Sequence, residues 1–97
     1  MALDVAPIRI GEDVLMASNV QLLTATHPLE PVARRAKWES AKPTAIGDNA
    51  WPGGGAIVLP GVSIGQDTVV GAGAVVVRDL PAGVLAVGNP ARVVRSL

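Results

Sequence analysis

Hydrophobic residues return at every sixth position along most of this chain. Written in sixes, one column is almost entirely aliphatic and holds Ile10, Met16, Leu22, Ile46, Pro52, Val58, Ile64, Val70 and Val76. The next column is mostly small and contains Gly11, Ala17, Gly47, Gly53, Gly65 and Gly71. A third column, four positions after the first, is small or β-branched until Leu80 departs from it: Val14, Val20, Thr26, Ala50, Ala56, Val62, Thr68 and Ala74. A period of six fits neither an amphipathic helix nor the alternation of a simple hairpin sheet.

The period predicts short parallel strands wound into a solenoid, with one flat face for each six residues. The aliphatic column points inward, and stacked coils turn it into a ladder inside a narrow prism. The small column lets the chain turn a corner where a larger side chain would clash, or where φ has to be positive. No coil buries its ladder alone, so several are needed. A β-sandwich is the competing interpretation, but a register held over so many units makes it the weaker one.

Composition supports a small all-β prism and excludes several classes of protein. The 97 residues suffice for one domain at most, taken here as residues 1–97. There is no Cys, which excludes disulfides and thiolate metal sites. Eight Lys and Arg balance eight Asp and Glu, so charge gives no argument for nucleic acid or membrane as a partner. Gly and Pro interrupt every apolar stretch, and Met1–Ile10 lacks the pattern of a secretion signal, so a cytoplasmic protein is expected.

The six-residue register breaks once, between Thr24 and Thr44. This segment contains the chain's only histidine, His27, and prolines stiffen both of its ends. It also concentrates charged residues: Glu30, Arg34, Arg35, Lys37, Glu39 and Lys42. A charged loop on a rigid scaffold is where function usually sits. From the residues alone, an ordinary solvated histidine is the leading interpretation of His27.

Motifs along the chain give it a family resemblance. They are Thr24-Ala25-Thr26-His27-Pro28-Leu29, Ala41-Lys42-Pro43, Ile46-Gly47-Asp48-Asn49-Ala50-Trp51 and Asn89-Pro90-Ala91-Arg92-Val93-Val94-Arg95. In this order and spacing they resemble the hexapeptide-repeat acyltransferases, in the branch of the maltose and galactoside O-acetyltransferases. The resemblance implies a left-handed parallel β-helix of about three coils (Ile8–Thr24, Ile46–Ser63 and Ile64–Pro81). It also implies a protruding loop at 24–44 and a C-terminal tail at 82–97.

The resemblance implies a reaction as well. Members of this branch transfer the acetyl group of acetyl-CoA to a hydroxyl of a sugar or a similar small acceptor, and the histidine at the position of His27 is the general base. An imidazole with an ordinary pKa of about 6.5 suits this task, because at neutral pH it can accept the hydroxyl proton as the oxygen attacks the thioester. Asp4 resembles a family aspartate near the acceptor. The aromatic face of Trp38 could flank the sugar, or equally cover apolar surface.

Three residues resemble those that line the channel for the acyl donor in the family. Gly54 and Ala72 correspond to positions along the pantetheine arm of CoA, and Trp51 resembles an aromatic residue near the channel. Each residue also has an alternative explanation. Gly54 and Ala72 could be small only because the turn of the solenoid requires small residues there, and Trp51 could pack at a contact between subunits.

Four further residues resemble those at the adenosine and phosphate end of CoA. Val77 and Arg78 correspond to positions beside the adenosine, and Arg92 and Arg95 to arginines on the phosphate side. Arginine suits phosphate because it stays charged and presents a fork of donors. The alternative for Arg92 and Arg95 is a solubilising tail.

The chain departs from this family chiefly in length. Members of this branch are considerably longer and carry further coils, with part of the acceptor site, before the residues that match this chain. Ladder residues Ile8 and Ile10 are therefore expected to face water at an uncapped end, which invites pairing with another chain. Pro52 is a second departure, since it occupies an inward position and removes one backbone N–H.

The family assembles as homotrimers with each active site between two subunits, and the same assembly is expected here. The main alternative to an O-acetyltransferase is a non-catalytic module that binds CoA weakly or only self-assembles. A zinc enzyme of the same fold would need three histidines at each site, and this chain has one, so no metal is expected.

Overall fold

The structure is a computed structural model and describes residues 6–26, 29–36 and 40–97. Asp4, His27 and Trp38 lie outside the described residues. In chain order the elements are β1 (Ile8–Ile10), β2 (Gln21–Leu22), β3 (Ala25–Thr26), α1 (Pro31–Arg35), β4 (Ser40–Ala41), β5 (Thr44–Ile46), β6 (Trp51–Pro52), β7 (Ile57–Val58), β8 (Ser63–Ile64), β9 (Val69–Val70), β10 (Val75–Val76), β11 (Val84–Val87) and β12 (Arg92–Ser96).

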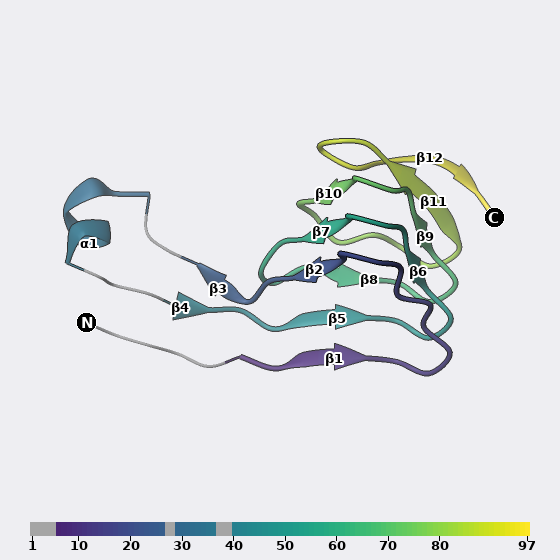
Figure 1. Ribbon diagram of the computed structural model, residues 1–97, viewed down its shortest axis with the longest axis horizontal. Coiled ribbons are helices and arrows are strands. Elements are labelled where there is room, and N and C mark those ends of the chain that lie inside the picture. The colour runs from purple at the N-terminus through teal and green to yellow at the C-terminus, as the bar shows by residue number, and fades with distance from the viewer. Residues whose placement is uncertain (1–5, 27–28, 37–39) are drawn as a thin grey trace.

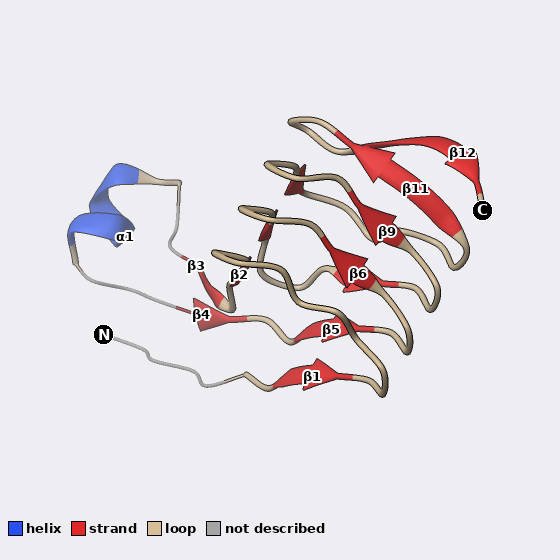
Figure 2. Cartoon of the chain, turned by 45° about the vertical axis from the view of Figure 1, so that its right-hand side comes forward, coloured by secondary structure: helices blue, strands red, loops and turns tan. Residues whose placement is uncertain are grey.

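Three sheets form the three sides of a solenoid (Figures 1 and 2). Their strand orders are β1-β5-β8, β10-β7-β2 and β12-β11-β9-β6. Neighbouring strands come from successive turns of the chain and run parallel, except that β12 is antiparallel to β11. The pairs Ile46–Ile64 and Val58–Val76 each lie three six-residue units apart. A parallel β-helix built from six-residue units is therefore confirmed, whereas its left-handed winding stays a prediction.

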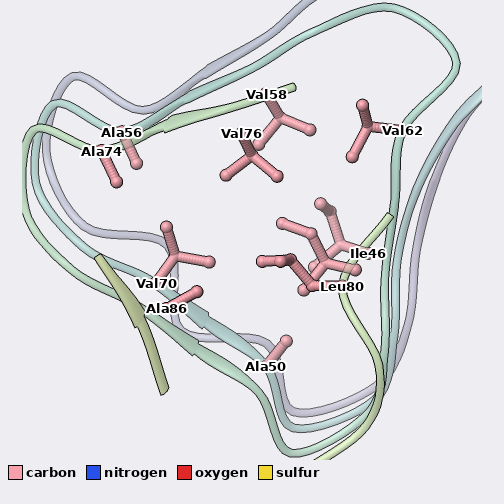
Figure 3. Close-up of a cluster of buried hydrophobic side chains, with 11 residues drawn as sticks. Ile46, Ala50, Ala56, Val58, Val62, Val70, Ala74, Val76, Leu80 and Ala86 are labelled. Carbon is pink, nitrogen blue, oxygen red and sulfur yellow. The ribbon is translucent and has the colours of Figure 1, made fainter. Parts of the chain in front are cut away.

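The inward aliphatic column forms the core. Figure 3 shows that side chains from all three sides converge on a roughly triangular interior. Val58, Val70 and Val76 are fully enclosed, and Ala50 and Ala56 lie buried at two of the corners. Valine and isoleucine suit these strands because their branched side chains pack well on a pleated surface.

Leu80 departs from its column because the chain takes a shorter path around one corner. It pairs in parallel with Ile64, 16 residues earlier, and the β11–β9 pairing has the same spacing. Two residues are therefore missing after β10 relative to the preceding turn, so Leu80 takes the inward aliphatic position. The register restarts from it, since Val84 and Ala86 are buried four and six positions later.

Two buried threonines tie neighbouring turns together. The Thr68 hydroxyl donates to the carbonyl oxygen of Pro81 at 2.6 Å and accepts the N–H of Val84 at 3.3 Å. The Thr44 hydroxyl donates to the carbonyl oxygen of Leu23 at 2.8 Å. A buried polar group without a partner costs about 1–3 kcal/mol, so these bonds explain how hydroxyls can occupy core positions.

Strands β3 and β4 and helix α1 leave the solenoid as an arm, with α1 at its far end (Figures 1 and 2). Strands β3 and β4 pair antiparallel along the arm, and at its base the Lys42 N–H donates to the Thr24 carbonyl at 2.9 Å. Leu29 and Val32 near α1 are 92% and 74% exposed, so the outer part of the arm leaves apolar side chains in solvent. Within the described ranges, no helix combines the length and hydrophobicity needed to cross a membrane.

The C-terminal segment covers one end of the prism. Strand β11 continues the sheet of β6 and β9, and β12 folds back antiparallel on β11. The turn at 88–91 lies against Val75, whose N–H donates to the Gly88 carbonyl at 3.0 Å and whose carbonyl accepts the Ala91 N–H at 2.8 Å. The segment 82–97, expected as a tail, therefore contains two paired strands.

Candidate functional site

One corner of the solenoid is nearly free of side chains in its second and third turns, whereas the first turn has Ser18 and Asn19 there. The Gly55 N–H donates to the Ser18 carbonyl at 2.9 Å, and the Gly73 N–H donates to the Gly54 carbonyl at 2.8 Å, so these turns stack directly. A Cβ added at Gly54 would approach only the Ser18 carbonyl oxygen, at 3.6 Å, and one added at Gly73 would meet nothing within 4 Å. We call Ser18, Gly54, Gly55, Ala72 and Gly73 the open corner.

The open corner presents backbone donors without partners. The N–H groups of Gly54 and Ala72 donate to no backbone acceptor in the described part of the chain. Ala72 is exposed and Gly54 is half-buried. Because neighbouring turns stack about 4.8 Å apart, the two donors form a short row along the prism axis. Such a row can bind an extended ligand that carries carbonyl groups, and the lack of side chains lets that ligand approach the backbone.

Two arginines lie close to the covered end of the same prism. Val77 and Arg78 directly follow β10 and are exposed. The turn at 88–91, which is bonded to Val75 of β10, leads into β12, and Arg92 is the first residue of that strand. The strand pairing thus brings Val77, Arg78 and Arg92 to one end of the molecule. Guanidinium groups there can bind phosphate oxygens through paired, charge-assisted hydrogen bonds.

Trp51 and Arg95 lie at opposite edges of the sheet β12-β11-β9-β6. The register runs from Trp51 through Val69 and Leu85 to Arg95. Three strand spacings separate the two backbones, which is about 14 Å. Trp51 is 48% exposed and points outward, because the next residue, Pro52, points into the core. Within one chain, the structure does not bring Trp51 and Arg95 together.

The carboxylate of Glu30 caps α1 on the arm. It accepts the N–H of Ala33 at 2.7 Å and that of Val32 at 2.9 Å. These two bonds, first that of Ala33, hold the pKa of Glu30 below its ordinary value of 4.5. Glu30 therefore stabilises the first turn of α1. Across the described ranges, no group of three His, Asp or Glu side chains is placed to hold a metal ion.

The sequence matches the bacterial transferases with six hexapeptide repeats over residues 43–78. A hexapeptide-repeat containing acetyltransferase from Vibrio cholerae O1 biovar eltor, solved with acetyl coenzyme A, has a TM-score of 0.83 and 31% sequence identity, and the match covers 97% of this chain and 68% of that chain. The chain belongs to the hexapeptide-repeat acetyltransferase family.

Two further relatives of this hexapeptide-repeat protein bear on its function. One relative is a Schizosaccharomyces pombe protein named as a putative acetyltransferase. It is 55% identical to this chain over 95 residues, which are 98% of this chain and 46% of the relative. A maltose O-acetyltransferase from Clostridium difficile 630 has a TM-score of 0.84 and 34% identity, over 98% of this chain and 65% of that chain. The chain spans about half the length of the curated relatives it matches.

The sequence predicts that some of the site residues lie on the arm of this hexapeptide-repeat protein. The structure describes only some of the residues of the arm. His27 and Trp38 fall outside the described ranges, as does Asp4 at the N-terminus. The described neighbour of His27 is Thr26, which ends β3 and pairs with Ser40 of β4. The roles of Asp4, His27 and Trp38 therefore remain predictions.

Sequence reasoning missed part of the open corner. It did not single out Ser18 or Gly73, although the six-residue period held the signal for both. Ser18 precedes Gly54 by six such units, and Gly73 follows Ala72 directly. It also missed the contact of the 88–91 turn with β10, which follows from hydrogen bonds between segments distant in sequence.

Proposed function

We propose that this chain is an acetyl-CoA-dependent O-acetyltransferase that acts on a hydroxyl of a sugar or a similar small acceptor. Its relatives support the proposal, since one was solved with acetyl coenzyme A and another is a maltose O-acetyltransferase. The open corner is the structural observation that carries it, because it combines unpaired backbone donors with room for an extended ligand.

The chemistry of coenzyme A fits the residues at and near the open corner. The pantetheine arm is long and flexible and contains amide groups, whose carbonyl oxygens can accept the N–H groups of Gly54 and Ala72. The phosphates at the other end need cations, which Arg78, Arg92 and Arg95 supply. All three arginines are exposed, so phosphate oxygens can reach their guanidinium groups.

Two apolar residues complete the proposed donor site. Val77 is 40% exposed beside Arg78, which suits contact with the adenosine. Trp51 lies 48% exposed on the neighbouring side of the prism, and we assign it to the border of the channel. Because it is separated from Arg95 within one chain, Trp51 can also serve at a contact between subunits.

His27 is the proposed general base. Bound acetyl coenzyme A supplies the acetyl group as an activated thioester. A neutral imidazole accepts the proton of the acceptor hydroxyl as its oxygen attacks the carbonyl carbon, and then returns a proton to the departing thiolate. Backbone N–H groups stabilise the negative charge on the carbonyl oxygen. The carboxylate of Asp4 accepts hydrogen bonds from the acceptor, and the indole of Trp38 stacks on its ring.

A thiol-release assay over a panel of sugar acceptors tests this proposal. His27→Ala should lower kcat by about 10²- to 10⁴-fold, the usual contribution of a positioned acid–base group. Its affinity for CoA, measured by calorimetry, should be retained. Arg34→Ala is the matched control, because it removes an exposed side chain from the same arm. Full turnover by His27→Ala would show that this histidine is not the base.

The donor site can be tested separately with a bulky substitution at the open corner. Ala72→Trp places a large side chain where the pantetheine arm would lie, and it should weaken CoA binding by at least about tenfold, or about 1.4 kcal/mol. Ala82→Trp is the control, since it changes another exposed alanine at a different corner. If CoA binding is insensitive to Ala72→Trp and no acceptor supports turnover, the alternative of a self-assembling module is favoured.

We also propose a homotrimer in which the arm of one subunit brings His27 to the arginines of its neighbour. The exposed Leu29 and Val32 support this arrangement, because apolar side chains on a projecting arm are stabilised when a second chain covers them. Light scattering should report three times the chain mass of 9.8 kDa, or a multiple of that trimer. A monomer that turns over would exclude a shared site.

A further inference from the structure

The corner that follows β7 and β10 is shorter in the third turn of the solenoid than in the second. These two strands pair before the corner, and Ile64 pairs with Leu80 after it. Five residues, 59–63, therefore round the corner in the second turn, and three residues, 77–79, round it in the third. The middle residue of the shorter segment thus lies next to the middle residue of the longer one. This corner is at the other end of β7 and β10 from the open corner.

Gly61 is the middle residue of the longer segment, and the side chain of Lys42 lies over it. A Cβ added at Gly61 would lie 3.2 Å from both Cβ and Cδ of Lys42. Gly61 also has a φ of 81°, a conformation that favours glycine. The backbone of Lys42 is fixed at the base of the arm, since its N–H donates to the Thr24 carbonyl at 2.9 Å. The missing side chain at Gly61 therefore gives the stem of Lys42 a defined path across this corner.

Arg78 is the middle residue of the shorter segment, so Lys42, Gly61 and Arg78 follow one another along the prism axis. Neighbouring turns stack about 4.8 Å apart, which separates the backbones of Lys42 and Arg78 by about 10 Å. The side chain of Lys42 crosses part of this distance, because it lies over Gly61 of the next turn. Both cations are exposed. A small anion in solvent can therefore contact both of them.

The charge of this corner favours an anion. Asp79 is the carboxylate that follows Arg78 in the chain, and its Oδ1 accepts the N–H of Ser63 at 2.8 Å. Asp79 is thus directed at the backbone of the preceding turn, and two cations stand against its one negative charge. A phosphate group suits such a pair, because Arg binds its oxygens with a planar fork of donors and Lys binds it as a point charge.

We propose that Lys42 and Arg78 form a binding site for a phosphate group. The site itself does not depend on the proposed enzymatic function, but the source of the phosphate rests on it. The donor supplies phosphates at the nucleotide end of CoA, and a phosphorylated sugar would supply one as the acceptor. The proposed donor and acceptor sites do not include Lys42, so the proposal adds this residue to the binding surface.

Inorganic phosphate is the first probe, because it tests the site without any turnover. In NMR spectra of the wild type, added phosphate should shift the amide resonances of Gly61 and Arg78. The amide of Gly83, a glycine of positive φ at a different corner, should not follow them. Wild-type resonances of Gly61 and Arg78 that do not respond to phosphate would overturn the proposal, whether or not any variant folds.

Substitutions at Lys42 test its part in the site. Lys42→Gln keeps most of the stem over Gly61 and removes the charge, so it should weaken phosphate binding by about tenfold, the effect of losing one hydrogen bond to a charged group. Lys42→Arg keeps the cation and should retain most of the affinity. Arg35→Gln is the matched control, because it removes an exposed cation from α1 on the same arm. An equal loss in Arg35→Gln would overturn the proposal, since total charge would then explain both results.

Calorimetry with four ligands identifies the source of the phosphate. The ligands are CoA, dephospho-CoA, a hexose and its 6-phosphate. If Lys42→Gln weakens the binding of CoA but not of dephospho-CoA, the site binds the 3′-phosphate of CoA. An equal loss for both coenzymes assigns the site to the diphosphate. A loss for the hexose phosphate alone assigns it to the acceptor.

Unchanged affinity of Lys42→Gln for all the phosphorylated ligands would overturn the proposal. The binding measurements also separate this proposal from the enzymatic one. A chain that binds phosphate through Lys42 but transfers no acetyl group contradicts the proposed function and leaves the phosphate site in place. A chain that acetylates a sugar and binds phosphate equally well without the charge of Lys42 contradicts only the phosphate site.

Discussion

At the scale of single residues, the structure decides why the second column of the repeat is small. The sequence left two explanations open, a clash or a positive φ. At Gly47 the reason is a clash, because an added Cβ would lie 2.6 Å from the backbone nitrogen of Gln66. Positive φ falls instead two residues later in the same corner, at Asn49 with 57°, and at Asp67 with 62° one turn on. Glycine satisfies both explanations, so the pattern alone could not distinguish them.

This difference predicts how alanine substitutions affect stability. Gly47→Ala should lower the free energy of unfolding by about 1–3 kcal/mol, the usual cost of overpacking, because backbone atoms of the next turn cannot move aside easily. Gly54→Ala should have little effect, since its Cβ would approach only the Ser18 carbonyl, at 3.6 Å, and its φ is not positive. Urea denaturation of both variants measures the difference. Equal stabilities would show that the turns are not packed as closely as described.

At the scale of elements, the repeat predicted where the regular solenoid is interrupted but not what the interruption contains. Strands β3 and β4 have two residues each and α1 has five, which is too short for any periodicity to be seen. A local signal for the helix was present, because proline favours the first position of a helix and Pro31 occupies it. Without the structure, that proline is equally well explained as a residue that stiffens the segment. Glu30 gives no comparable signal of a cap, because Glu is rarer at that position than Ser, Thr, Asp or Asn.

The Glu30 cap predicts an acid-sensitive helix. The pKa of Glu30 is lowered from 4.5 in the folded chain by its bonds to the Ala33 and Val32 N–H groups. A carboxylate with a lowered pKa stabilises the folded arm fully above its unfolded value, and this contribution is lost as pH falls through the lowered pKa. The amide resonances of Val32 and Ala33 should therefore titrate together below pH 4.5.

Glu30→Gln should abolish that titration, whereas Glu12→Gln, which changes an exposed carboxylate on the solenoid, should leave it intact. The capping role would be contradicted if the amide resonances of Val32 and Ala33 did not shift as the pH is lowered.

At the scale of the whole molecule, the parallel β-helix could be predicted from a repeat of only six residues. Strands that pair lie a whole number of these repeats apart, so the repeat indicates their long-range pairing. The final turn could not, since two residues are missing before Leu80 and the register restarts out of phase. The same limit applies to the candidate site. The period relates Gly54 to Ala72, but the position of Arg92 depends on the 88–91 turn folding over β10, which no local pattern encodes.

The covered C-terminal end leads to the last prediction. Deleting residues 88–97 removes β12 and its turn, which leaves the edge of β11 unpaired and uncovers buried Val84 and Ala86 at that end. An exposed strand edge with apolar neighbours promotes association. The truncated chain should therefore form larger, concentration-dependent assemblies, measured by light scattering, because the edge of β11 is then free to pair with another chain.

Arg92→Ala combined with Arg95→Ala separates this effect from the loss of the two cations, since it keeps β12 in place. That double variant should retain the wild-type mass while its affinity for CoA falls. If the truncated chain has the same mass as the double variant, β12 is not what stops the solenoid from growing at this end.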